Sequence, residues 1–152
     1  MSTKLTTIFV SIIILISVIA GVFLYDMLPD QMASHWNAND EVDGYTGKFW
    51  GTFLMPVVSF GMFLLFLLIP HLDPLKENVA KFRETFNLFI IMMVLFMSYI
   101  WGLSVFWNLD YWIFRMSTAI LPAMGLLFVF IGYMLRKAKR NWFIGIRTPW
   151  TL

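Results

Sequence analysis

Long apolar stretches alternate with short polar ones along the whole chain. Four of the apolar stretches exceed the roughly 18 residues that mark a membrane-spanning segment. They lie at about residues 5–25, 49–69, 86–107 and 111–135. Within lipid, a helix is the form in which one segment satisfies all of its own backbone hydrogen bonds. The pattern therefore predicts an all-α integral membrane protein, in which residues 1–152 form one domain of four transmembrane helices in an antiparallel bundle.

The polar intervals between these spans predict the connecting structure. The longest interval, residues 29–48, separates the first two spans, and its turn-forming pairs predict an ordered irregular loop with a short hairpin at Asp43-Gly44. Charged and apolar residues alternate over 75–84, which predicts a short amphipathic helix at the membrane interface. Asn108-Leu109-Asp110 predicts a tight turn between the last two helices.

Composition and charge fix the class of protein and its orientation. Hydrophobic residues make up 60% of the chain and charged residues only 13%, whereas soluble domains carry about 25% charged residues. Nine of the eleven Lys and Arg residues lie before the first span, between the second and third spans, or after the fourth. Because basic residues concentrate on the cytoplasmic side of a cell membrane, both termini and the tail at 136–152 are expected in the cytoplasm. The loop at 29–48 is expected outside the cell membrane.

The outer loop holds four side chains that could ligate Zn²⁺ or Ca²⁺, namely His35, Asp40, Glu41 and Asp43. Their spacing matches no zinc motif and no EF-hand, and the chain has no cysteine. A solvated acidic loop is therefore the preferred interpretation, and no metal or other cofactor is predicted. No catalytic motif and no acid in the middle of a span is present, so an enzyme is not expected. A metal-binding membrane enzyme and a small transporter of unknown substrate remain as alternatives.

Two ionisable residues lie nearest to the hydrocarbon, Asp26 at the end of the first span and Arg115 near the start of the fourth. Charged groups at that depth tend to pair or to line a polar cavity. We therefore expect an ion pair of Arg115 with Asp26 or with Asp110. The alternative is that each side chain reaches separately to the membrane interface.

Two separate motifs resemble one family of membrane proteins. Leu28-Pro29, His35-Trp36-Asn37, Asp43-Gly44 and Lys48 resemble the N-terminal domain of unknown function found in SdpI-type proteins. Asn141 and the run at 144–152 resemble the signature of the SdpI family itself. The motifs occur in the expected order and bracket nearly the whole chain. Family members usually continue past the second motif through two further spans, which the sequence given does not include.

The resemblance implies a function without catalysis. The best-known member of the SdpI family is an immunity protein against a sporulation-delaying peptide toxin, and it signals by holding a cytoplasmic transcriptional repressor at the membrane. By this resemblance, the outer loop senses an extracellular peptide toxin through His35, Trp36, Asn37, Asp43, Gly44 and Lys48. The tail contacts the cytoplasmic repressor through Asn141, Gly145, Arg147, Thr148, Pro149 and Trp150. The alternative for the tail is an amphipathic segment that rests in the lipid headgroups. No direct contact with nucleic acid is expected.

Overall fold

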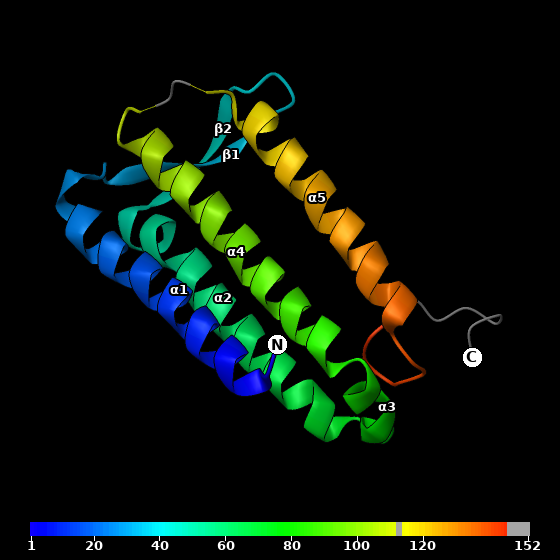
Figure 1. The fold of residues 1–152 in the computed structure, drawn as a ribbon. Coiled ribbons are helices and arrows are strands. Elements are labelled where there is room, and N and C mark those ends of the chain that lie inside the picture. The colour runs from blue at the N-terminus through cyan, green and yellow to red at the C-terminus, as the bar shows by residue number, and fades with distance from the viewer. Residues whose placement is uncertain (112–113, 146–152) are drawn as a thin grey trace.

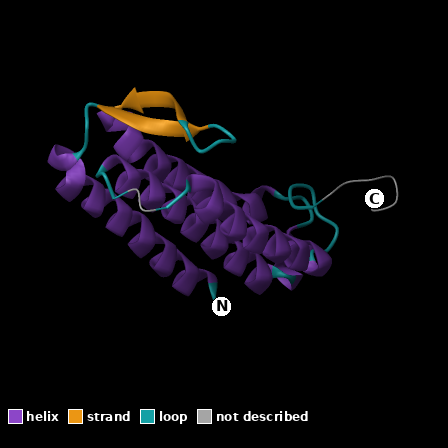
Figure 2. Ribbon diagram, turned by 90° about the horizontal axis from the view of Figure 1, so that it is seen from above, coloured by secondary structure: helices purple, strands orange, loops and turns teal. Residues whose placement is uncertain are grey.

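The computed structural model describes residues 1–111 and 114–145. Within these residues four long helices lie side by side, and a small β-hairpin covers one end of them (Figures 1 and 2). The elements in chain order are α1 Thr3–Leu24, η1 Tyr25–Met27, β1 Gln31–Trp36, β2 Val42–Gly47, α2 Lys48–Leu72, α3 Lys76–Lys81, α4 Arg83–Asn108 and α5 Met116–Lys137. The four long helices are each long and apolar enough to cross a membrane. The prediction of four apolar helices of membrane-spanning length is confirmed.

Helix α4 lies at the centre of the arrangement, because α1, α2 and α5 all pack against it. The main core cluster joins α1, α2, α3 and α4, and it consists of Val10, Ile14, Phe63, Val79, Phe82, Phe86, Ile90, Ile91 and Val94. Large apolar side chains also cover the outer faces, such as Phe23, 80% exposed, and Val129, 72% exposed. Helices that are apolar on every face suit a lipid environment.

The expectation of an all-α fold is wrong for the outer loop, because residues 31–36 and 42–47 form two antiparallel strands. The predicted hairpin exists, but Asp43-Gly44 lies within β2 and the turn lies at 37–41. The Asn37 side chain makes this turn, since its Oδ1 accepts hydrogen bonds from the N–H groups of Asn39 (2.8 Å) and Glu41 (3.0 Å). An Asn side chain that bonds the backbone ahead of it is a strong turn former.

The connection between α4 and α5 is longer than predicted. Helix α4 ends at Asn108 and α5 begins only at Met116, so the fourth span starts later than residue 111. Asp110 has a φ of 63°, which turns the chain away from the helix axis. The short helix expected over 75–84 is present as α3, with Val79 buried and Lys76, Glu77 and Lys81 exposed.

Candidate functional site

The hairpin packs directly on the ends of α2 and α4. Met32 of β1 is fully buried, and it forms a second core cluster with Leu28, Trp101 and Val105. Gly51 in the first turn of α2 makes this contact fit, because a Cβ at that position would lie 2.6 Å from Met32 Sδ and 2.9 Å from Met32 Cβ. A side chain at position 51 would therefore push β1 away from α2.

The last residue of α4, Asn108, binds the middle of β1. Its Oδ1 accepts a hydrogen bond from the backbone N–H of Ala33 at 2.7 Å, and its Nδ2 donates to the Ala33 carbonyl at 3.0 Å. The same Nδ2 donates to the Ser104 carbonyl at 2.9 Å. One side-chain amide thus satisfies both backbone groups of a buried strand residue, and it also bonds a carbonyl in the last turns of its own helix.

The tip of the hairpin binds the start of α5 through Asp40. Its Oδ1 accepts from the backbone N–H of Ser117 at 2.8 Å, and its Oδ2 accepts from the Ser117 hydroxyl at 2.6 Å. These two hydrogen bonds lower the pKa of Asp40, and the charge of Arg115 lowers it further. A carboxylate that accepts an N–H in the first turn caps a helix. Asp40 therefore caps α5 from a distant part of the chain.

A buried hydrogen bond lies beneath the hairpin, between α4 and α2. Pro56 inside α2 has no N–H, so the carbonyl of Thr52 lacks its usual helical donor four residues on. The indole Nε1 of Trp101 donates to this carbonyl at 2.7 Å. The Thr52 hydroxyl donates to the Lys48 carbonyl at 2.8 Å. The proline is therefore compensated by a neighbouring helix, as is common in membrane helices.

The six predicted sensor residues divide into exposed and structural ones. His35 Nδ1 and Asp43 Oδ1 lie 2.5 Å apart across the strands, and their side chains are 71% and 46% exposed. Trp36 packs edge-on against Trp107 with ring centroids 5.6 Å apart. The remaining three residues of the predicted set, Asn37, Gly44 and Lys48, have local structural roles.

Asn37 builds the turn described above, and the other two residues hold the strands in place. Gly44 allows β1 and β2 to approach closely, because a Cβ there would lie 2.9 Å from His35 Cβ. Lys48 Nζ lies 3.7 Å from Asp30 Oδ1 and 5.3 Å from the centroid of the Tyr25 ring. The structure thus leaves the His35–Asp43 pair as the part of the predicted set that a ligand can reach most easily.

Of the four weak metal candidates, only His35 and Asp43 lie together. Asp40 turns to Ser117, and Glu41 accepts a hydrogen bond from Asn37 Nδ2 at 3.0 Å. Within residues 1–111 and 114–145, no group of three or more His, Cys, Asp or Glu residues is placed to hold a metal ion.

The predicted ion pairs of Arg115 are absent from the described residues. Arg115 lies within 4.0 Å of neither Asp26 nor Asp110, and the pairs that do form join the N-terminal amine to Glu84, His35 to Asp43, and Lys48 to Asp30. The reason is that α5 starts late, which leaves Arg115 just before the helix and near Asp40.

The start of the tail folds against the opposite end of the helices. Asn141 is buried, and its Oδ1 accepts from the N–H groups of Phe143 and Ile144. The N–H of Trp142 donates to Oδ2 of Asp73 at 2.8 Å. Gly145 has a φ of 127°, a conformation that glycine adopts readily. The other predicted tail residues, Arg147, Thr148, Pro149 and Trp150, lie outside the described residues.

Several residues that organise the site were not singled out from the sequence, namely Asn108, Ser117, Trp101 and Asp73. Each acts through a partner far away along the chain. Pro56 was one available signal, because a proline inside a span leaves a carbonyl that needs a donor.

Two comparisons place the chain among known proteins. A family model described as a domain of unknown function (DUF1648) matches residues 12–60, which run from α1 through the hairpin into α2. The immunity protein SdpI of Bacillus subtilis (strain 168) is 26% identical over 141 residues. That alignment covers 93% of this chain and 65% of the relative, so the chain spans less than two thirds of that protein's length. No solved structure gives a significant match.

Proposed function

We propose that this chain belongs to the SdpI family, as the two matches support. We further propose that it is a membrane immunity protein and receptor that acts without a catalytic step. In this proposal, the hairpin faces outward and senses an extracellular peptide toxin. The tail faces the cytoplasm and signals by binding a transcriptional repressor. The distribution of basic residues supports this orientation in the cell membrane.

The observation that carries the proposal is the attachment of one small hairpin to three helix ends. Met32 packs on α2 at Gly51, Ala33 bonds α4 through Asn108, and Asp40 caps α5 at Ser117. A ligand that moves the hairpin therefore changes contacts at all three helices. An element of this kind can convert binding into a change in helix packing, provided that the ligand prefers one arrangement over the other.

Helix α5 is the best candidate to carry the signal to the tail. Its first turn is capped by Asp40 of the hairpin, and its last residue, Lys137, leads into the segment that bonds to Asp73 and packs on the core through Ile144. Between its two ends, α5 packs on α4. A helix that packs against one neighbouring helix can shift while few packing contacts are broken, and a shift of α5 would reach the contacts at both of its ends.

The exposed chemistry of the hairpin suits a peptide ligand. The imidazole of His35 and the carboxylate of Asp43 are solvent-accessible and adjacent, and Tyr45 on β2 is 64% exposed. Such groups offer hydrogen bonds, charge and an aromatic surface, as peptide-binding surfaces usually do.

The test is survival of toxin-sensitive bacteria that express the chain and are challenged with a sporulation-delaying-type peptide. We expect protection by the wild-type chain and its loss in the His35→Ala/Trp36→Ala variant. Ser34→Ala serves as the control, because it removes only a hydroxyl from an exposed position of the same strand. Equal protection by the double variant and the wild type at matched membrane levels would refute the role of the hairpin as the toxin sensor. No protection by the correctly inserted wild-type chain would refute the immunity function for this chain.

A further inference from the structure

A groove of about 730 Å³ opens at the end of the helices opposite the hairpin. Its walls come from the start of α1, the end of α2, the short helix α3 and the start of α4, and its lining includes Thr3, Pro70, His71, Lys76, Glu77 and Arg83. None of these residues has a part in the proposed sensing of a toxin.

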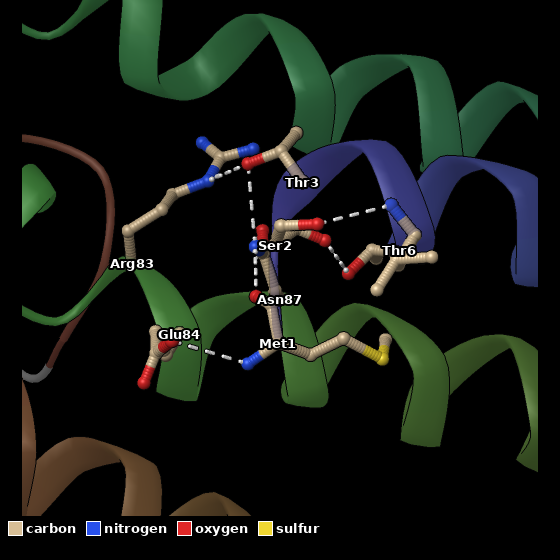
Figure 3. A network of polar contacts seen from close by, with 8 residues as sticks. Met1, Ser2, Thr3, Thr6, Arg83, Glu84 and Asn87 are labelled. Atoms are coloured by element: carbon tan, nitrogen blue, oxygen red, sulfur yellow. Dashed lines mark hydrogen bonds and ion pairs between the residues drawn. The ribbon is translucent and has the colours of Figure 1, made fainter.

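The guanidinium of Arg83 is held in place at this groove. Its Nε donates to the Thr3 hydroxyl at 3.2 Å, and its Cζ lies 5.7 Å from the centroid of the Phe86 ring. Figure 3 shows the Arg83 side chain reaching Thr3, while Glu84 turns to the N-terminal amine of Met1. No hydrogen bond from the terminal guanidinium nitrogens is present among the described residues. Those nitrogens therefore remain available for a ligand, in the fork geometry that suits a phosphate group.

The groove carries an excess of positive charge. Two cations, Lys76 and Arg83, line it together with one acid, Glu77, and none of these three takes part in an ion pair within the described part of the chain. Lys81, which lies on α3 outside the lining, donates a hydrogen bond to Asn78 Oδ1 at 3.0 Å. The electrostatics of the groove thus favour an anion.

The position of the groove indicates where the anion comes from. Thr3 and Arg83 are the first residues of α1 and α4, and His71 is the last but one of α2, so three membrane-length helices begin or end at this level. Apolar side chains among the last five residues of α2, the helix that ends at this groove, are exposed, with Leu68 at 53% and Leu72 at 61%. A phospholipid matches both features, because its charged headgroup lies at the interface and its acyl chains lie beside the helices.

We propose that this groove is a binding site for the headgroup of an anionic phospholipid. Arg83 and Lys76 contact the phosphate, and the acyl chains lie along the outer face of α2 near Leu68 and Leu72. The site is independent of the proposed toxin immunity, since it lies at the other end of the helices.

The test is native mass spectrometry of the purified full chain, titrated with phosphatidylglycerol and, in parallel, with phosphatidylcholine of the same acyl composition. We expect phosphatidylglycerol to bind more tightly. In Lys76→Gln/Arg83→Gln we expect its dissociation constant to rise about 30-fold, from the usual contribution of each basic residue near a membrane surface. The matched control is Lys139→Gln/Arg140→Gln, which removes the same charge from exposed residues outside the lining. It should change the constant less than about 3-fold.

A second variant tests the site even if the double variant folds poorly. Glu77→Gln removes the acid from the groove, so it should tighten phosphatidylglycerol binding about 5-fold, and a misfolded protein cannot give that result. Equal effects of the groove variant and the control, or no tightening in Glu77→Gln, would overturn the site. Full displacement of the lipid by millimolar inorganic phosphate would show a free-phosphate site and would overturn the assignment to lipid.

Discussion

The hydrogen bond from Trp101 to the Thr52 carbonyl provides a sharp test of how α2 and α4 fit together. In Trp101→Phe the aromatic ring stays, but the indole N–H is lost and the Thr52 carbonyl has no donor, because Pro56 has none to offer. Leaving a buried acceptor without a partner costs about 1–3 kcal/mol in proteins generally. Measured couplings between helices in membranes are smaller, about 0.6 kcal/mol on average and about 1.7 at most. Because this bond is 2.7 Å long and Trp101 is only 8% exposed, we expect a value near the upper end, about 1.5 kcal/mol.

The double-mutant cycle with Pro56→Ala isolates this term from the loss of ring volume. The substitution restores a backbone N–H four residues after Thr52, so the Thr52 carbonyl regains a helical donor. Trp101→Phe should therefore cost about 1.5 kcal/mol less in the Pro56→Ala background than in the wild type. The free energies of unfolding are measured in mixed micelles by SDS titration, with far-UV circular dichroism as the signal because the substitution removes a tryptophan fluorophore. Effects that add to within about 0.3–0.5 kcal/mol would refute the compensation of Pro56 by Trp101.

Two further predictions concern the hairpin. Because the pKa of Asp40 is lowered in the folded state by Ser117, its carboxylate stabilises the fold above the unfolded-state pKa of about 4, and this is lost as the pH falls through the lowered folded value. Stability measured over that acidic range should fall less steeply in Asp40→Asn; an unchanged slope would count against the cap. Gly51→Ala should destabilise the protein by about 1–3 kcal/mol through overlap with Met32. The control Gly61→Ala, which meets no atom within 4 Å, should be neutral or slightly stabilising by thermal unfolding; equal effects would contradict the close packing of β1 on α2.

The spans could be predicted from the sequence because lipid imposes one requirement on every residue within them. A chain segment in hydrocarbon must satisfy its own backbone groups, so length and apolarity suffice to locate a helix. The predicted start of α5 was wrong because apolarity alone does not determine the residue at which a helix begins. Tyr111 and the residues after it are apolar enough for a span, but α5 begins at Met116, where its first turn is capped by Asp40 from another loop.

The hairpin illustrates a second limit of prediction from the sequence. Asp43-Gly44 is a strong local turn signal, but the Asn37 side chain bonds two N–H groups ahead of it and fixes the turn earlier. Gly44 is needed for a different reason, which is the close approach of His35 on the other strand. Local signals of turn residues cannot distinguish these two uses of glycine.

The candidate site could be predicted only in part. His35, Asp40 and Asp43 were recognised as polar residues of one loop, but the sequence could not show that Asp40 turns to Ser117 while His35 and Asp43 pair. Asn108 and Trp101 act through partners that are brought near only when α4 packs on β1 and α2. Such contacts depend on helix packing, which the hydrophobic pattern leaves undetermined.

The amide of Asn108 also governs how the sheet could be extended. The sheet has two strands, so each strand has one outer edge, and unpaired strand edges are where an extended peptide adds by backbone hydrogen bonds. Asn108 occupies both backbone groups of Ala33 and thereby closes the edge of β1 at its centre. A peptide that adds to β1 must displace this side chain and release the end of α4, whereas a peptide that adds to β2 leaves α4 attached. The edge to which a peptide adds therefore decides whether the hydrogen bonds between Asn108 and Ala33 have to break.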